Sequence, residues 1–169
     1  MYKRQIQADS FESIEFSPQD LTNRNKSFGG QLSVDLERLL NHSDCVIRSS
    51  NVLVDDRNRR YLSPHSLYIK TKKSAGQSYG VFCNDGMRLH HFGTCNDGVG
   101  KSACGGEIIV QPEETVDVTK LQENVLVGNF ALFGATGGRL FVRGQAGDRF
   151  AVRNLSLIHI SEPTRLRRI

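Results

Sequence analysis

The clearest alternation of apolar and polar positions in this chain lies in residues 124–154. There the segments LVGNFALF, RLFVR and RFAVRN alternate branched or aromatic residues with small or charged ones, a pattern typical of half-buried β-strands. Glycines separate the segments, and a residue without Cβ adopts the positive φ of a tight corner at no steric cost. Because no corner has room for a helix, the strands are expected either to pair as hairpins or to wind as the coils of a solenoid.

The spacing of the glycines favours the solenoid. Pairs of glycines recur about twenty positions apart, a period typical of repeat architectures with one coil per repeat; the pairs are Gly80 and Gly100, Gly86 and Gly105, and Gly128 and Gly147. An antiparallel sandwich is the alternative, since Asp85-Gly86 and Asp97-Gly98 suit two-residue hairpin turns. The pattern alone leaves both architectures open.

Two sets of residues are expected to have structural roles in the coils. The first set forms glycine corners, and its members are Gly76, Gly80, Gly86, Gly100, Gly105, Gly106, Gly128, Gly134, Gly137, Gly138, Gly144 and Gly147. The second set is a possible asparagine ladder of Asn124, Asn129 and Asn154, which would stack amide hydrogen bonds at equivalent coil positions.

A single helix is predicted before the coils. Phe28, Leu32, Leu36 and the Leu39-Leu40 pair recur at spacings of three and four, which places them on one helical face. Asn25 or Ser27 would cap its start. Residues 44–69 contain three apolar runs that predict strands, with a hairpin around residues 56–58, and coils are expected from about residue 66. Residues 112–122 lack glycine and are acidic, which indicates an excursion between coils.

The two ends of the chain differ from the rest. Residues 1–5 (MYKRQ) and 155–169 (LSLIHISEPTRLRRI) look like translated sequencing-adapter read-through; the alternative is an ordinary basic terminus without fixed structure. We therefore divide the chain into an adapter-like segment at 1–5, a lead-in with one helix at 6–43, a coil domain at 44–154 and an adapter-like or disordered tail at 155–169. The coil domain is expected to be incomplete at its C-terminal end.

Composition excludes some classes of partner. The formal net charge is +4, but residues 6–154 carry equal numbers of acidic and basic side chains, so no electrostatic footprint for nucleic acid remains. No run of about 18 apolar residues predicts a membrane span, and the N-terminus lacks the apolar stretch of a signal peptide. Cys45, Cys83, Cys95 and Cys104 show neither a CxxC pair nor a ligand-like grouping, which predicts reduced thiols in a cytosolic protein.

Several motifs imitate functional sites. Residues 98–103 (GVGKSA) and 133–138 (FGATGG) contain pieces of nucleotide-binding motifs, but such motifs need a following helix, and both are followed by apparent strands. His90 and His91 are adjacent, so strand alternation sends them to opposite faces and they cannot readily share a metal. Glu107 and Asp148 are expected to be turn or ladder partners. No catalytic, cofactor-binding or metal-binding residue is predicted.

Four segments together resemble the C-terminal GXGXG domain of the glutamate synthase large subunit: SAGQSYG (74–80), NDGVGK (96–101), GGEIIVQP (105–112) and residues 124–154. NRNKSFGGQLS (23–33) is similar to the helix that precedes this domain. The resemblance covers roughly residues 20–154 and implies a mainly β protein, a right-handed parallel β-helix (single-stranded solenoid) preceded by a short helix. Gly98 stands where the family usually has an aromatic residue, and Ser102 stands where it usually has glycine.

The resemblance also implies a role. In glutamate synthase this domain is non-catalytic and braces an amidotransferase domain and an FMN domain, while the parent enzyme makes glutamate from glutamine and 2-oxoglutarate. This chain alone is thus expected to be inactive and to hold no cofactor, with FMN and an iron–sulfur cluster in the parent oxidoreductase. Expected partners are those two domains and a small electron-donating subunit, in the cytoplasm or a plastid. The alternative is a stand-alone GXGXG scaffold protein of another redox complex, similar to the β-helical subunit of formylmethanofuran dehydrogenase, and a weaker one is an independent ligand-binding solenoid.

Overall fold

The computed structural model describes residues 14–41, 50–113 and 124–154, and within these ranges the protein is mainly β with one helix. The helix is α2 (Gly30–Asn41). The strands are β1 (Ile14–Leu21), β2 (Val52–Val54), β3 (Arg60–Leu62), β4 (Leu67–Ala75), β5 (Met87–Cys95), β6 (Cys104–Gln111), β7 (Val125–Val127), β8 (Gly137–Val142) and β9 (Gln145–Ala146).

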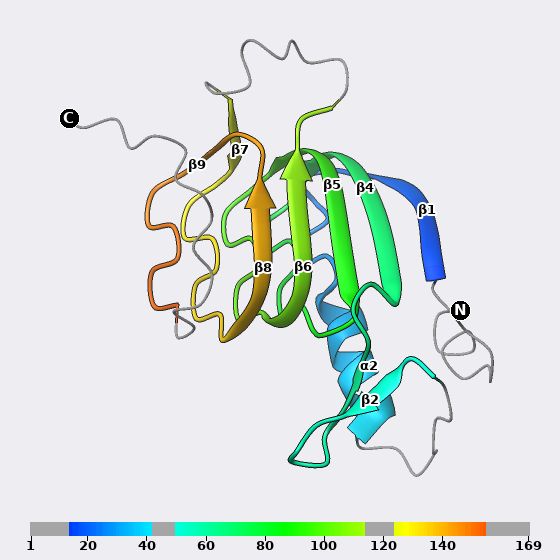
Figure 1. The fold of residues 1–169 in the computed structure, drawn as a ribbon. Helices are drawn as coiled ribbons and strands as arrows, with labels where there is room; N and C mark the ends of the chain where they lie inside the picture. The colour runs from blue at the N-terminus through cyan, green and yellow to red at the C-terminus, as the bar shows by residue number, and fades with distance from the viewer. Residues whose placement is uncertain (1–13, 42–49, 114–123, 155–169) are drawn as a thin grey trace.

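The strands build one parallel sheet with the order β1-β4-β5-β6-β8 (Figure 1), and β7 pairs with β5 and β9. Every pairing in this sheet is parallel, so the antiparallel sandwich is wrong for the described residues. The hairpin expected around residues 56–58 is confirmed, because β2 and β3 pair antiparallel as a separate two-stranded sheet. The expected lead-in contributes β1, which is the first strand of the large sheet.

Register places chemically similar residues beside one another across the sheet. Ile69 pairs with Leu89, Leu89 with Ile108, and Ile108 with Leu140, and all four side chains are buried. Strand alternation buries Leu67, Ile69 and Thr71 of β4 and Met87, Leu89 and His91 of β5 in the same core. Burial of each Leu or Ile contributes roughly 1.5–3 kcal/mol, so these rows hold successive strands in register.

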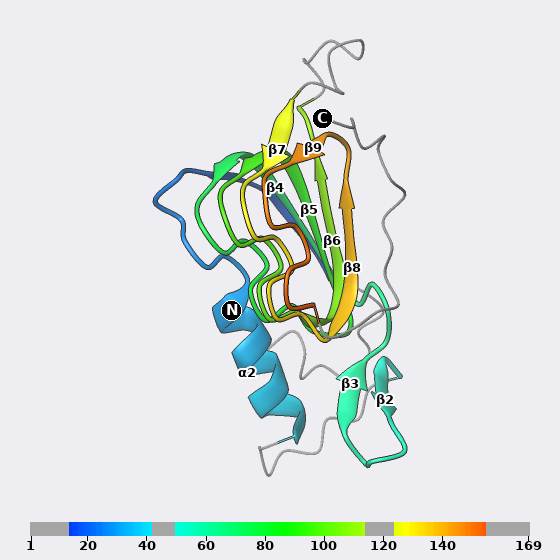
Figure 2. The same cartoon turned by 90° about the vertical axis from the view of Figure 1, so that its left-hand side faces the viewer.

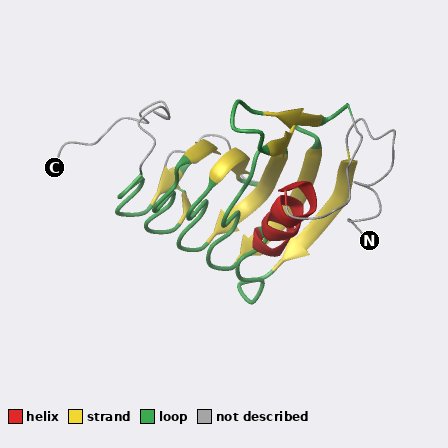
Figure 3. Ribbon diagram, turned by 90° about the horizontal axis from the view of Figure 1, so that it is seen from below, coloured by secondary structure: helices red, strands yellow, loops and turns green. Residues whose placement is uncertain are grey.

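The loops after the strands also lie one on another (Figure 2). Backbone N–H groups reach the carbonyl of the adjacent loop at equivalent positions: Gly80 N to Phe28 O at 2.9 Å, Gly100 N to Tyr79 O at 2.8 Å, and Leu132 N to Val99 O at 2.7 Å. Seen from below, these loops form a row with α2 beside its N-terminal part (Figure 3). The loops therefore pair by backbone hydrogen bonds, as the strands do.

Each of the four loops from residue 78 onward has three left-handed residues at alternate positions. The triplets with positive φ are Ser78, Gly80 and Phe82; Gly98, Gly100 and Ser102; Phe130, Leu132 and Gly134; and Arg149, Ala151 and Arg153. A left-handed residue with a side chain costs roughly 1–2 kcal/mol, so glycine suits these positions. At Gly80 the choice is also steric, because Ile108 Cγ1 would lie 3.3 Å from an added Cβ.

The twelve predicted glycine corners fall into two groups. Six have positive φ, namely Gly80, Gly86, Gly100, Gly106, Gly134 and Gly138. The other six, Gly76, Gly105, Gly128, Gly137, Gly144 and Gly147, lie where the adjacent loop or strand leaves no room for a Cβ. At Gly76, for example, an added Cβ would stand 2.7 Å from the Asn23 carbonyl oxygen.

The helix begins two residues later than the apolar spacing predicts. Ser27 and Gly29 have φ of 54° and 86°, so residues 27–29 form a loop corner, and Phe28 stacks on Tyr79 at a centroid distance of 5.5 Å. Asn25 does not cap the helix, since its Oδ1 accepts from the Thr22 backbone N–H at 2.8 Å. From Gly30 the chain turns away as α2, which buries Leu36 and Leu40.

Candidate functional site

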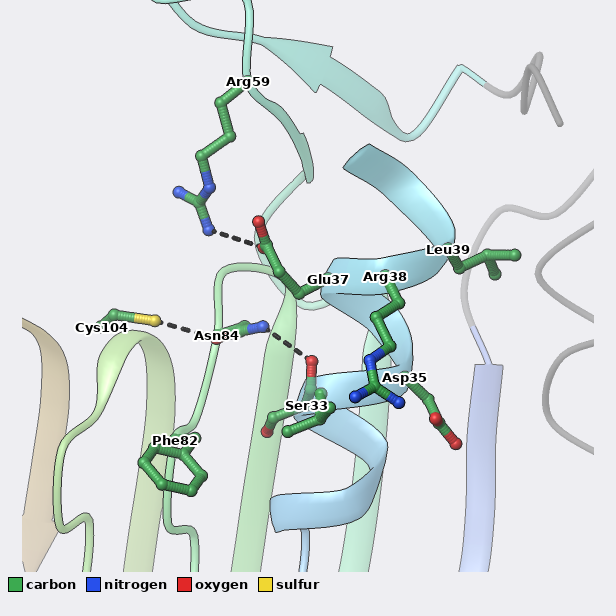
Figure 4. A pocket seen from close by; sticks show the side chains of 10 residues that line it. Ser33, Asp35, Glu37, Arg38, Leu39, Arg59, Phe82, Asn84 and Cys104 are labelled. Carbon is green, nitrogen blue, oxygen red and sulfur yellow. Dashed lines mark hydrogen bonds and ion pairs between the residues drawn. The ribbon is translucent and has the colours of Figure 1, made fainter. Parts of the chain in front are cut away.

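One cavity is an open groove of about 870 Å³ that borders α2 and the loops after β4 and β5 (Figure 4). Its lining residues come from distant parts of the chain: Ser33, Val34, Asp35, Glu37, Arg38, Leu39, Arg59, Phe82, Asn84 and Cys104. We call this cavity the α2 groove. Sequence analysis missed it, because only tertiary contacts bring the helix, the β2–β3 hairpin and two successive loops together.

The polar groups inside the α2 groove bind one another. Asn84 Nδ2 donates to the Ser33 carbonyl at 3.0 Å, and the Cys104 thiol donates to Asn84 Oδ1 at 2.9 Å. Arg59 contacts Glu37 at 3.3 Å and Asp85 at 3.5 Å (Figure 4 draws the Glu37 pair). Burial lowers the pKa of Arg59, and the hydrogen bond and charge of Glu37 outweigh that effect, so the pKa is raised.

Two residues of the α2 groove are not used in this way. Phe82 is 48% exposed, and its backbone is left-handed with φ of 57°. Arg38 lies exposed in the last turn of α2, and no described residue forms an ion pair with it. The groove thus offers an exposed aromatic ring and a guanidinium that forms no ion pair with a described residue and lies beside the carboxylate of Asp35.

The described cysteines are not activated nucleophiles. Burial raises the pKa of Cys104, and it raises the pKa of Cys83 to about 12 and that of Cys95 still further. A thiolate is the nucleophilic form, so these side chains stay protonated near neutral pH. Cys45 lies outside the described residues.

The two adjacent histidines face opposite sides of β5, as alternation predicts. His90 faces outward, where its ring stacks on Phe92 at 4.3 Å and its Nδ1 lies 2.8 Å from the Tyr68 hydroxyl. His91 is fully buried, and its Nε2 lies 3.0 Å from the Lys73 carbonyl. Burial lowers the pKa of both rings. They cannot share a metal ion.

A second cavity of about 330 Å³ lies beside the outer face of the sheet, next to Glu107. Glu107 faces Arg88 and Arg139 across the parallel register. Its carboxylate lies 2.8 Å from Arg88 Nε, 3.4 Å from Arg139 Nη2 and 3.7 Å from His65 Nε2. Glu107 is therefore a cross-strand partner of two arginines, as expected from the sequence.

A side-chain ladder does exist, but with different members from those expected. Asp97 Oδ1 accepts from the Asn129 backbone N–H at 2.8 Å, and Asn129 Oδ1 accepts from the Asp148 backbone N–H at 2.9 Å. Of the predicted trio, Asn129 belongs to this ladder. Asn124 and Asn129 flank the same short strand, β7, so they cannot occupy equivalent positions in successive repeats.

The apparent phosphate-binding motifs lie in the left-handed corners. Residues 98–103 lead into strand β6, and residues 133–138 lead into β8. Neither stretch precedes a helix, so neither provides the helix N-terminus that such motifs place against phosphate. Within residues 14–41, 50–113 and 124–154, no three His, Cys, Asp or Glu side chains converge as metal ligands would. Among the same residues, no helix is both long and apolar enough to cross a membrane.

Comparison with known proteins defines the class to which this fold belongs. The family model described as the GXGXG motif matches residues 41–164, and the chain belongs to that family. Its relatives include glutamate synthases. The chain is 36% identical over 133 residues to ferredoxin-dependent glutamate synthase 2 of Synechocystis sp., an alignment that covers 71% of this chain and 8% of the relative.

Other relatives carry similar names. Identity is 53% over 81 residues to the chloroplastic/mitochondrial ferredoxin-dependent glutamate synthase 1 of Arabidopsis thaliana, covering 48% of this chain and 5% of that protein. It is 46% over 93 residues to the large chain of glutamate synthase [NADPH] from Azospirillum brasilense, covering 55% and 6%. The chain therefore spans less than a tenth of the length of these relatives.

Proposed function

We propose that this chain is the GXGXG domain of a glutamate synthase and that its parallel strands and stacked loops are the coils of a right-handed β-helix. Strand, corner and return recur in residues 67–86, 87–106 and onward, with loop hydrogen bonds between equivalent positions. Right-handed connections are the rule between parallel strands. The excursion expected at residues 112–122 lies for the most part outside the described residues.

The proposed role is to brace the amidotransferase and FMN domains of the same polypeptide without taking part in catalysis. One observation carries this role: the polar groups of Asn84, Cys104, Arg59 and Glu37 in the α2 groove are engaged within the domain. A catalytic site would instead aim free groups at its substrate. The FMN, the iron–sulfur cluster and the contact with an electron-donating subunit would belong to other parts of the enzyme, in the cytoplasm or a plastid.

A chimeric enzyme tests this proposal. In the Synechocystis ferredoxin-dependent glutamate synthase 2, the stretch matched by this chain is replaced by the matching part of this chain. The chimera is expected to form glutamate from glutamine and 2-oxoglutarate with reduced ferredoxin. The control carries a Gly/Ser linker of equal length and is expected to be inactive. A chimera no more active than the control would overturn the proposal and favour a scaffold protein of a different redox complex.

A further inference from the structure

The two outer strands of the large sheet, β1 and β8, each have one edge that pairs with no strand among the described residues. An open edge presents backbone N–H and C=O groups that pair readily with another strand. The helix α2 runs below the sheet rather than beyond β1 (Figures 1 and 3). Within the part of the chain that the structure describes, both ends of the sheet are therefore open.

The loops at these two ends offer matching backbone groups. We call residues 22–29, after β1, the first loop and residues 147–154, after β9, the last loop. The first left-handed residue of a loop donates its N–H to the loop that follows: Ser27 to the Gln77 carbonyl at 2.8 Å, Ser78 to Asp97 at 2.8 Å, Gly98 to Asn129 at 2.9 Å and Phe130 to Asp148 at 2.9 Å. The equivalent N–H of Arg149 has no acceptor among the described residues. The equivalent acceptor in the first loop is the Lys26 carbonyl, and no described N–H donates to it.

A second set of loop bonds runs in the opposite direction. The second left-handed residue donates to the preceding loop, as Gly80 does to the Phe28 carbonyl at 2.9 Å and Ala151 does to the Ala131 carbonyl at 2.8 Å. The next acceptor in this series is the Phe150 carbonyl, and the donor that precedes the series is the Gly29 N–H. Neither has a backbone partner in the described ranges. Each end of the molecule thus offers the groups that would pair with the other end.

The side chains of the two end loops are complementary in charge. Lys26 and Asp148 each precede the first left-handed residue of their loop, so they occupy equivalent positions. Both are exposed, and neither forms an ion pair with a described residue. Placing the last loop of one molecule on the first loop of another would set Asp148 beside Lys26, while the neighbouring Arg149 would meet the uncharged Ser27.

The outer face of the sheet shows the same complementarity. One register row runs from Glu15 through Tyr68, Arg88 and Glu107 to Arg139, and its end members Glu15 and Arg139 are 57% and 52% exposed. Glu107 already binds an arginine on each side, so a carboxylate in this row accommodates two cations. Glu15 contacts Lys70, and it would accept Arg139 of a second molecule in the same way.

The column of residues inside the loops ends in two aromatic rings. Tyr79, Val99 and Ala131 are fully buried between neighbouring loops, whereas the end members Phe28 and Phe150 are only partly buried. Phe28 stacks on Tyr79 at a centroid distance of 5.5 Å. A further loop placed on Phe150 would bury the rest of its ring, and removal of apolar surface from water favours such a contact.

We propose that copies of this chain stack head to tail, with β8 and the last loop of one copy placed against β1 and the first loop of the next. The contact continues the parallel pairing and the loop hydrogen bonds already present in the molecule. A two-fold dimer through β8 would instead pair two strands antiparallel, unlike every pairing in this sheet. Because the contact is heterologous, it adds copies in an open series. This inference concerns the chain itself and does not depend on the proposed function.

Charge reversal at the junction tests the proposal by sedimentation velocity of the 169-residue chain. The wild-type chain is expected to form dimers and longer oligomers with a dissociation constant of about 1 mM or tighter. Asp148→Lys and Lys26→Asp each place like charges at the junction, so each is expected to raise that constant about fivefold or more. An equimolar mixture of the two variants restores opposite charges at every junction and is expected to associate as the wild type does. Unchanged melting of each variant verifies folding.

The chain provides a matched control away from both ends. Asp56 and Arg57 are exposed in the turn between β2 and β3, so Asp56→Lys and Arg57→Asp make the same changes in charge. Neither substitution, alone or in the mixture, is expected to alter association. A wild-type chain that stays monomeric up to about 1 mM, or a mixture that associates no better than its separate components, overturns the proposal.

Disulfide crosslinking tests the direction of stacking. Neighbouring strands lie about 5 Å apart, a separation that suits a disulfide between stacked positions. Lys26→Cys and Asp148→Cys are mixed under mild oxidation, and mass spectrometry of the linked peptides is expected to find position 26 joined to position 148. Links that join 26 to 26 or 148 to 148 at comparable yield would show two-fold pairing and overturn the head-to-tail arrangement.

Discussion

His91 Nδ1 lies 2.8 Å from Thr71 Oγ1 in the interior of the sheet, and this contact sets the direction of a buried chain of hydrogen bonds. His91 Nε2–H donates to the Lys73 and Thr94 carbonyls at 3.0 and 3.1 Å, so Nδ1 of the neutral ring must accept from the Thr71 hydroxyl. Thr71 Oγ1 in turn accepts from the Tyr79 hydroxyl at 2.9 Å. The network also satisfies the carbonyl of Lys73, a left-handed residue at the end of the pairing between β1 and β4.

This network predicts that the fold loses stability in mild acid. Burial lowers the pKa of His91 in the folded state, so the unfolded state binds more protons below the ordinary histidine pKa of about 6.5. The stabilisation is therefore complete above that pH and is lost as pH falls, by at most about 1.4 kcal/mol per pH unit for one group. Urea denaturation at pH 7.5 and pH 5.0 measures it.

The control for this prediction is His91→Gln, which keeps an N–H for the carbonyls but does not titrate. It is expected to show a smaller loss between the two pH values than the wild-type chain. The outward-facing His90, whose pKa is also lowered, contributes equally to both proteins. Identical pH dependence in the two would show that the acid sensitivity does not come from His91.

The left-handed corners predict opposite effects for two substitutions in one loop. Gly100 has φ of 64°, and an added Cβ would stand 2.9 Å from Leu132 Cδ2. Gly100→Ala is therefore expected to lower the free energy of unfolding by about 2 kcal/mol or more. Ser102 has φ of 53°, so Ser102→Gly relieves strain and is expected to be neutral or stabilising by up to about 1 kcal/mol. Urea titrations followed by circular dichroism distinguish these signs.

The same loops show how far sequence reasoning reaches. Leu67 pairs with Met87, twenty positions on, and Arg88 pairs with Glu107, nineteen positions on, so the glycine period correctly predicts the strand repeat. Glycine alone does not reveal the other left-handed positions, because residues such as Phe82 adopt this backbone only when adjacent loops impose it. Helical periodicity likewise assigns Phe28 to the helix, whereas Phe28 lies in the loop corner between the left-handed Ser27 and Gly29.

The candidate site was less predictable than the fold. The α2 groove depends on contacts between Arg59 of the hairpin, Glu37 of the helix and Asp85 of a loop, and these are separated by more than twenty positions. No local pattern encodes such a meeting. The sequence contains one weak signal for an unusual loop. Phe82 is the third left-handed residue of its loop, and the next two loops have the smaller Ser102 and Gly134 at that position.

The ion pairs of Glu107 predict that Glu107→Gln lowers the free energy of unfolding more than Arg139→Gln does. Its side chain is only 8% exposed, and it meets Arg88 Nε at 2.8 Å. Glu107→Gln removes the charge that balances Arg88 in a partly buried position, and we expect a loss of about 1–3 kcal/mol. Arg139 is 52% exposed, so Arg139→Gln is expected to cost less than about 1 kcal/mol. Comparable losses from both substitutions in urea denaturation would contradict the assignment of Arg88 as the principal partner.

The ladder of Asp97, Asn129 and Asp148 predicts a local effect on the loops. Asp97→Ala removes the acceptor of the Asn129 backbone N–H, and because the bond is solvent-exposed, water replaces part of the loss, so the cost is expected to be about 0.5–1.5 kcal/mol. Hydrogen exchange at the Asn129 amide should quicken several-fold more than exchange at the Leu132 amide, whose acceptor is the Val99 carbonyl. Asp97→Asn keeps an acceptor oxygen and should leave Asn129 protected. If Asp97→Ala accelerated both amides equally, the change would be global unfolding and the ladder would have no separate local role.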